Sequence, residues 1–208
     1  SSYRRTAQEN IYIDLVRHTT LGLDLSVRIL HKFTGQLHGS GKYTQVYVPH
    51  LGDPFLSFDG FSLLDASLLH SQEEAYKETA VQLTLIKAYC LSWLFSCIPL
   101  ESLDSEFILY GTVGFLQNFY VEQVFGEEEG SYRVQKCIDS VLELEKQGHG
   151  LKFNQEFPVK LERLGRLKRQ LFLSKSTVLF HLLENRIGGR DAIRLLLSSL
   201  IQSTPLYD

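Results

Sequence analysis

Histidine and cysteine are the residue types in this chain that could bind a transition metal or form a nucleophilic centre. The seven histidines are scattered. None forms a His-x-x-x-His pair, the spacing at which two imidazoles on one helix face reach the same metal. We therefore expect no metal site. The histidines are interpreted as surface or hydrogen-bonded imidazoles; they are His18, His31, His38, His50, His70, His149 and His181.

The three cysteines show no metal-binding spacing, and their odd number fits a reducing compartment better than a disulfide framework. Cys90 and Cys97 stand seven positions apart, so they are expected on one side of a buried helix. The pattern predicts small core residues there. A Cys–His dyad with Cys90 or Cys97 as the nucleophile stays open, although no feature of the sequence points to one.

The segment 160–169 is locally basic, with five positive charges and one negative. Its leucines recur every three residues, which places an apolar face opposite a basic one. Such a helix can contact DNA phosphates, which add affinity without sequence choice, or it can be a solvated helix face. No aromatic residue is interleaved, which argues against base stacking. The candidate DNA or partner contacts are Lys160, Arg163, Arg166, Lys168 and Arg169.

Composition indicates a globular protein with a substantial core, since 44% of the residues are hydrophobic and 12% aromatic. The net charge of −3 excludes a strongly basic nucleic-acid binder, although local patches remain compatible with it. There is no methionine and no recognisable signal peptide, so we interpret the chain as a piece of a longer protein. The apolar stretch Val81–Ile98 is interrupted by polar residues and predicts a buried core helix rather than a membrane span.

The elements that must position any site are mostly helical. Apolar periodicity predicts a helix over residues 8–34. Alternating β-branched and aromatic residues predict a strand at 43–48 and a second short strand at 55–58. The apolar segment 61–69 fits either type. These residues predict a mainly α fold with a small pair of strands.

Further helices are predicted at residues 73–95, 105–125 and 132–146, with a turn at 126–130 between the last two. Gly111 and Gly114 weaken their helix intrinsically and indicate close packing against a neighbouring helix. The segment 151–158 has little pattern. A helical tail follows at 174–186 and 191–202, interrupted by two glycines, with Asp191 as an N-terminal cap or first-turn acid.

The order and spacing of these elements resemble those of a known family. The window Lys87-Ala-Tyr-Cys-Leu91 lies on the long helix, and Tyr110 follows after the 18 residues from Ser92 to Leu109. This frame is similar to the thermolysin-like domain of the aminopeptidase N group of zinc peptidases (gluzincins). There the first helix carries His-Glu-x-x-His, and a glutamate ligand follows on the second helix after the same gap.

The resemblance implies a degenerate site. Lys87 and Leu91 stand where the family has its two histidines, Tyr110 stands at the glutamate ligand, and Ala88 replaces the general base. A lysine ammonium repels zinc and leucine cannot coordinate it, so the resemblance implies no enzyme activity and no cofactor. The substrate-binding Gly-Ala-Met-Glu-Asn stretch is replaced by Ser57-Phe-Asp-Gly-Phe61 on the expected edge strand.

Among relatives without zinc ligands, the sequence is most similar to the TBP-associated factor two family, which are subunits of the general transcription factor TFIID. Four short stretches carry this similarity: Arg17–Thr20, Ser67–Ser71, Leu109–Phe115 with Val124–Gly126, and Leu183–Ile187. The resemblance implies a nuclear, non-catalytic scaffold that contacts other TFIID subunits and, through its basic segment, promoter DNA. It implies no membrane and no small-molecule substrate. Residues 1–150 would form the thermolysin-like domain, and 151–208 its helical continuation.

Two other functions remain under consideration. An active hydrolase would need a rebuilt nucleophile or metal cluster, which the residues do not offer. A pseudoenzyme outside transcription would bind a peptide in the old cleft. Within that cleft, Lys87 would pair with Glu106 or Asp104 or extend to the cleft surface, and Tyr89 and Tyr110 are expected to fill the space left by the metal.

Overall fold

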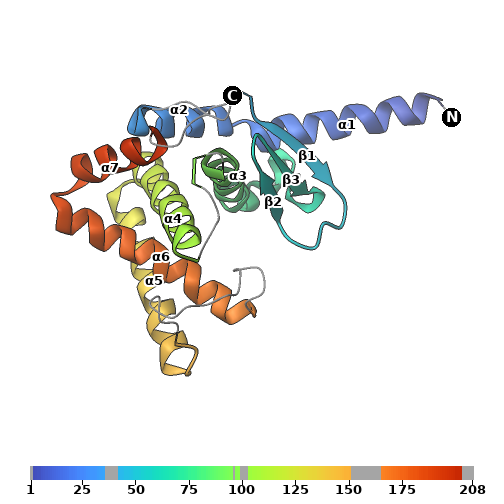
Figure 1. The fold of residues 1–208 in the computed structure, drawn as a ribbon. Coiled ribbons are helices and arrows are strands. Elements are labelled where there is room, and N and C mark those ends of the chain that lie inside the picture. Colours follow the sequence, from blue (N-terminus) through green and yellow to red (C-terminus); the bar gives the residue numbers. More distant parts are fainter. Residues whose placement is uncertain (1, 36–41, 96, 99–102, 151–164, 203–208) are drawn as a thin grey trace.

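The computed structural model describes residues 2–35, 42–95, 97–98, 103–150 and 165–202. This part of the chain is mainly helical and carries one small three-stranded sheet, which lies beside the helices in Figure 1. The predicted fold class is therefore confirmed at the level of a mainly α protein. The predicted pair of strands is corrected to three.

Two helices, α1 (Ser2–Thr20) and α2 (Leu23–Thr34), replace the single helix predicted over residues 8–34. The break falls at Gly22, where a Cβ would lie 2.2 Å from the side-chain nitrogen of Gln82. The missing side chain of Gly22 leaves room for the end of the Gln82 side chain on another helix, which would have to move if a Cβ were present. Helix α1 projects away from the rest of the molecule at the right of Figure 1.

The sheet contains β1 (Thr44–Val48), β2 (Phe55–Phe58) and β3 (Phe61–Asp65), in the order β1-β3-β2. Strand β1 runs parallel to β3, and β2 runs antiparallel to it. The first two strands confirm the prediction. The ambiguous segment 61–69 becomes β3 and a short 3₁₀ turn, Ala66–Leu68, and a second 3₁₀ turn covers Gln72–Glu74. Strand β2 is thus an edge strand of the described sheet.

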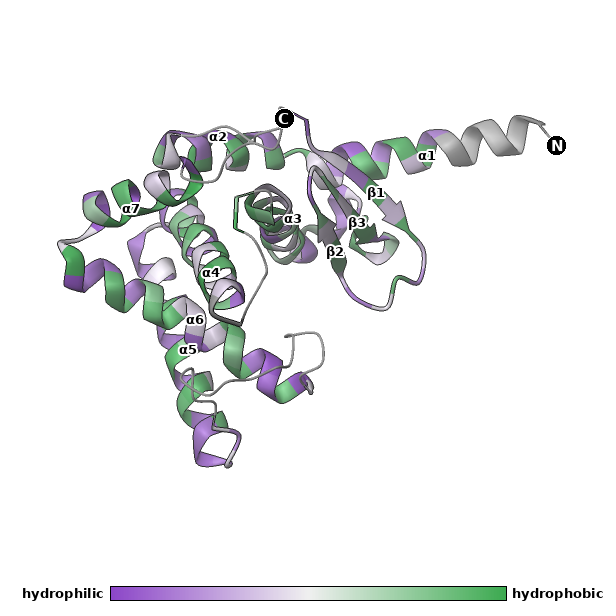
Figure 2. Cartoon of the chain, in the orientation of Figure 1, coloured by the Kyte–Doolittle hydropathy of each residue, from purple (hydrophilic) through white to green (hydrophobic). Residues whose placement is uncertain are grey.

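Helix α3 (Ala75–Phe95) is the centre of the fold, as predicted for a buried core helix. The sheet packs on one of its sides and α4 (Leu103–Phe125) on another. Trp93 and Leu94 are fully buried. Hydrophobic residues dominate α3 and α4 in Figure 2, whereas α5 is more polar. Within the described ranges, no helix combines the length and the apolarity that crossing a membrane requires.

The remaining helices are α5 (Glu127–Lys146), α6 (Arg166–Ile187) and α7 (Arg190–Gln202). The predicted turn at 126–130 is wrong beyond Gly126, because α5 already begins at Glu127. Gly126 alone provides the reversal, at φ 97°, and the three glutamates that follow favour the positive end of the helix dipole. Helix α6 starts earlier than the predicted residue 174. It ends at Gly188, and Asp191 lies in the first turn of α7 as predicted.

The two glycines of α4 do pack closely against a neighbouring helix, and that helix is α6. A Cβ on Gly111 would lie 2.3 Å from a ring carbon of Phe180, and one on Gly114 would lie 2.0 Å from the Thr177 hydroxyl oxygen. The main buried cluster joins residues of α3 and α4 to Phe180 of α6 and Ile193 of α7. The predicted patternless segment 151–158 lies outside the described residues, and so do Pro99 and His38.

Candidate functional site

A cleft of about 340 Å³ lies between the edge strand β2 and helices α3, α4 and α6. One wall is formed by β2 and the turn before it, and the floor by α3 and α4. The first turns of α6 close the far side. The lining residues are Asp53, Pro54, Phe55, Leu56, Ser57, Lys87, Leu91, Phe95, Tyr110, Arg169 and Leu173.

Three of the positions that define the zinc-peptidase frame meet in this cleft. Lys87 and Leu91 are four residues apart on α3 and therefore share a helix face, and Tyr110 reaches the same space from α4. The fourth position, Ala88, is fully buried on the other side of α3 against Leu64 of the sheet. The structure thus brings Lys87, Leu91 and Tyr110 together in one cleft.

Strand β2 is fixed to α3 by a hydrogen bond from a side chain. The hydroxyl of Ser57 donates to the carbonyl oxygen of Ala88 at 2.9 Å, and it lies 2.9 Å from the hydroxyl of Ser62 on β3. This contact holds the edge strand beside the turn of α3 that carries Lys87. It gives the cleft a rigid wall.

Lys87 is half-buried, and within the described residues it forms no ion pair and no hydrogen bond. Burial lowers the pKa of its ammonium, and the nearby thiol of Cys137 opposes this shift. The predicted pairing with Glu106 is therefore wrong. The other predicted partner, the side chain of Asp104, lies outside the described part. Lys87 thus places a cation in a partly desolvated cleft.

Tyr89 does not fill the cleft, which corrects the prediction. Its hydroxyl lies 2.6 Å from Nε2 of His31 on α2, and its ring meets Tyr43 edge to face. Two residues along a helix correspond to about 200° of rotation, so Tyr89 points away from the face of Lys87. Of the two tyrosines predicted to occupy this space, Tyr110 alone lines it.

The predicted basic segment is divided by the structure. Lys160 and Arg163 lie outside the described residues. Arg166 and Lys168 are exposed at the start of α6, whereas Arg169 is half-buried and lines the cleft. Leu167, which was expected on an apolar face, is 43% exposed.

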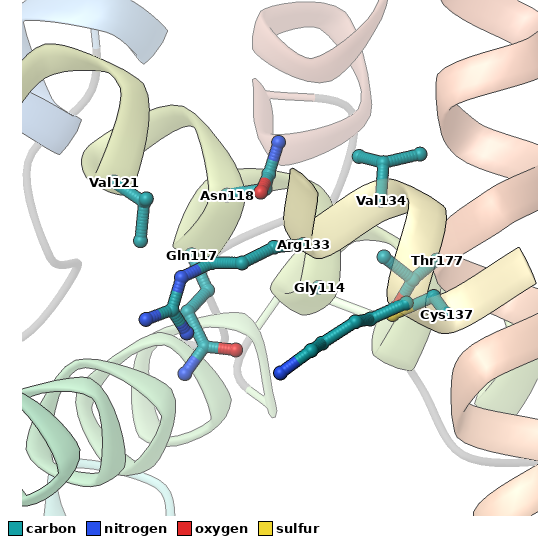
Figure 3. A pocket seen from close by; sticks show the side chains of 9 residues that line it. Gly114, Gln117, Asn118, Val121, Arg133, Val134, Cys137 and Thr177 are labelled. Atoms are coloured by element: carbon teal, nitrogen blue, oxygen red, sulfur yellow. The ribbon is translucent and has the colours of Figure 1, made fainter. Parts of the chain in front are cut away.

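A second pocket, of about 260 Å³, lies where α4, α5 and α6 meet. Figure 3 shows the side chains of Gln117 and Arg133 pointing toward the same space. Gln117 donates to the carbonyl oxygen of Leu83 at 2.8 Å, and Arg133 pairs with Glu129 at 2.8 Å. These two polar side chains are thus already engaged in contacts within the chain.

Cys137 lines the second pocket, and burial raises the pKa of its thiol. Cys90 is completely buried, which raises its pKa to about 12. A nucleophilic cysteine needs the opposite shift. Cys90 is therefore a core residue, as predicted, and all three cysteines are free thiols.

A third hollow surrounds Arg190 at the start of α7. Its guanidinium pairs with Glu122 of α4 at 2.8 Å and with Glu184 of α6 at 2.5 Å, and it lies over the rings of Phe115 and Phe119. The sequence analysis missed this cluster. Glu122 and Arg190 are 68 positions apart, and no local pattern connects them.

Within the described parts of the chain, no group of three or more His, Cys, Asp or Glu side chains is arranged to hold a metal ion. Comparison with known proteins adds no family assignment: no family model matches the chain, and no curated protein matches it. The functional argument therefore rests on the cleft and on the residues that line it.

Proposed function

We propose that this chain is a thermolysin-like domain of the aminopeptidase N type that has lost its zinc site. It acts as a non-catalytic interaction domain in a nuclear TFIID subunit similar to TBP-associated factor two. Its partners are other TFIID subunits.

The observation that carries the proposal is the meeting of Lys87, Leu91 and Tyr110 in one cleft beside an antiparallel edge strand. In the zinc peptidases the corresponding positions hold the metal, and the substrate-binding stretch lies on the edge strand. The positions of Lys87, Leu91 and Tyr110 in the sequence follow the spacing of the family's metal ligands. Their convergence in space supports descent from such a site.

The residues at these positions do not fit a zinc ion. The side chain of Leu91 has no donor atom, the ammonium of Lys87 repels a cation, and Ala88 cannot act as a base. We therefore expect no hydrolysis of aminoacyl-p-nitroanilides, with or without added zinc. Zinc-dependent turnover that survives Lys87→Met and Tyr110→Phe would show instead that a rebuilt site exists elsewhere.

The four stretches that resemble the TBP-associated factor two family also contribute contacts within the fold, which supports descent from the same fold. Thr19, in the first stretch, lies at the end of α1 and forms hydrogen bonds with His70, in the second stretch, at 3.1 and 3.2 Å. The third stretch contains Gly111 and Gly114, which allow α6 to approach α4. These contacts support a shared fold, and membership of TFIID follows from the resemblance.

A contact with promoter DNA is a narrower part of the proposal. It now depends on the exposed Arg166 and Lys168, because Arg169 lines the cleft. Such contacts would add affinity that weakens with salt and carries no sequence preference.

Affinity purification of the parent protein from its own cells, followed by mass spectrometry, tests the assembly. Recovery of TBP together with its associated factors supports the proposal, provided that an unrelated nuclear bait treated in the same way does not recover them. If these subunits are absent, the assignment to TFIID is wrong.

A second candidate function is peptide binding by a pseudoenzyme outside transcription. The observation in its favour is the open cleft next to the edge of β2, which no other described strand pairs with. The same purification distinguishes the two, since this candidate predicts that TBP and its associated factors are missing.

A further inference from the structure

Lys87 is half-buried where it borders the cleft. Within the described residues no carboxylate pairs with it, and burial lowers its pKa because partial removal from water disfavours the charged form. Buried charges in proteins are ordinarily paired or bind a ligand. An anion that enters the cleft would compensate this charge.

The charges that line the cleft also favour an anion. Arg169 enters from α6, so two cations from different helices border the same space. Among the described lining residues the one acid is Asp53, which is exposed in the turn before β2. Cations therefore outnumber acids in the described lining, in a chain whose net charge is −3.

The free edge of β2 provides backbone groups for an extended ligand. The amide of Asp65 on β3 donates to the carbonyl oxygen of Pro54 at 3.0 Å. In an antiparallel pair, hydrogen-bonded and non-bonded residues alternate. Phe55 and Ser57 therefore direct their backbone N–H and C=O groups away from β3, toward the free edge. Both residues line the cleft.

We propose that this cleft binds a carboxylate of an extended acidic peptide, with Lys87 and Arg169 contacting the carboxylate and the free edge of β2 contacting the peptide backbone. A cavity of about 340 Å³ admits a side chain or a chain end, but not a nucleic-acid duplex. The apolar walls formed by Leu91, Phe95 and Leu173 suit the remainder of such a residue. This site does not depend on the assembly to which the chain belongs.

Three acetylated peptides of matched length test the proposal by calorimetric titration into the full chain. The first ends in a free carboxylate, the second is its terminal amide, and the third is an amide that carries one internal glutamate. We expect the first or the third peptide to bind about tenfold or more tightly than the neutral amide. Which of the two binds identifies the carboxylate as terminal or as part of a side chain.

Variants identify the cation that binds. Lys87→Met should weaken the carboxylate peptide about tenfold, and Lys87→Arg should keep most of the affinity, since it keeps the charge. The matched control is Lys168→Met, an exposed lysine adjacent to Arg169 on α6, which should leave binding unchanged. Circular dichroism of each variant confirms that it is folded.

Three results would overturn the proposal. The neutral amide binds as tightly as the carboxylate peptides, Lys168→Met weakens binding as much as Lys87→Met does, or no carboxylate peptide binds the folded wild-type chain. The second result would indicate diffuse surface attraction. None of them bears on membership of TFIID, so the two proposals can fail separately.

Discussion

At the scale of single residues, the ionisation of Lys87 determines how the cleft behaves with pH. Burial lowers the pKa of this ammonium below its ordinary value of about 10.4. Between the folded and the unfolded pKa, the unfolded chain binds more protons, so the free energy of unfolding rises with pH across that interval. At neutral pH the buried ammonium therefore acts against stability.

We predict that Lys87→Met stabilises the protein at pH 7 by about 1 kcal/mol, because it removes an uncompensated charge and keeps the volume of the side chain. For a chain of this size the melting temperature should rise by about 2–4 °C, measurable by thermal denaturation. Lys168→Met, at an exposed position, should change stability by less than about 0.5 kcal/mol. A lower melting temperature for Lys87→Met would mean that the ammonium has a stabilising partner.

Some of the residue-level features could be predicted from the sequence, and others could not. The spacing of Lys87, Leu91 and Tyr110 was sufficient to place them in one cleft. Tyr89 follows Lys87 by two residues, about 200° around the helix, so its side chain faces away from the cleft. The prediction that Tyr89 fills the cleft did not take this rotation into account. The approach of Arg169 could not be predicted, because it depends on how α6 crosses α4.

At the scale of elements, apolar patterning identified the helices, while close contacts set their boundaries. Helix α3 was predicted within two residues of its start, and its residues from Val81 to Leu94 are mostly apolar and buried. The break between α1 and α2 was missed; at this break Gly22 lies against the side chain of Gln82 on α3, far along the sequence. Contacts of this kind leave no local signal in the sequence.

The stability of the fold should be most sensitive to added side-chain volume where α4 and α6 cross. Alanine at Gly111 would gain about 1 kcal/mol in helix propensity. Its Cβ would, however, lie 2.3 Å from a Phe180 ring carbon and 3.0 Å from the Ser176 carbonyl oxygen. Because overpacking costs about 1–3 kcal/mol, we predict that Gly111→Ala lowers the free energy of unfolding in urea by about 1–2 kcal/mol.

The rescue variant tests whether this loss comes from the crossing itself. Phe180→Leu gives the new methyl group space, so the double variant should be more stable than the sum of the two single changes predicts. Additive effects would indicate that the methyl group is accommodated elsewhere, and a stabilised Gly111→Ala would mean that helix propensity outweighs the steric contact.

At the scale of the whole molecule, helices α4, α6 and α7 are held together by charge as well as by apolar packing. Arg190 on α7 bridges Glu122 on α4 and Glu184 on α6, and His181 lies beside this cluster against Phe115. The consecutive helices α6 and α7 thus share one partly buried network with α4, which lies far from them in the sequence. A network of this kind makes global stability depend on pH, and no single segment of the sequence predicts it.

His181 should make the fold sensitive to acid. Burial, and secondly the cation of Arg190, lower its pKa to about 4, compared with about 6.5 for an unperturbed histidine. Its Nδ1 lies 3.6 Å from a carboxylate oxygen of Glu184, too far for a strong hydrogen bond to offset this effect. Between these two pKa values the unfolded chain binds more protons. The free energy of unfolding should therefore fall as the pH drops from about 6.5 to about 4, by up to about 3 kcal/mol.

We predict that His181→Gln loses less stability than the wild type across this interval, because glutamine does not titrate. Urea unfolding at a series of pH values measures the difference. Glu184 acts in the opposite direction, since burial raises its pKa, but both proteins carry it and its contribution largely cancels. His149→Gln, outside the network, should follow the wild-type curve. Parallel curves for wild type and His181→Gln would instead place the acid sensitivity of the fold in groups other than this junction of α4, α6 and α7.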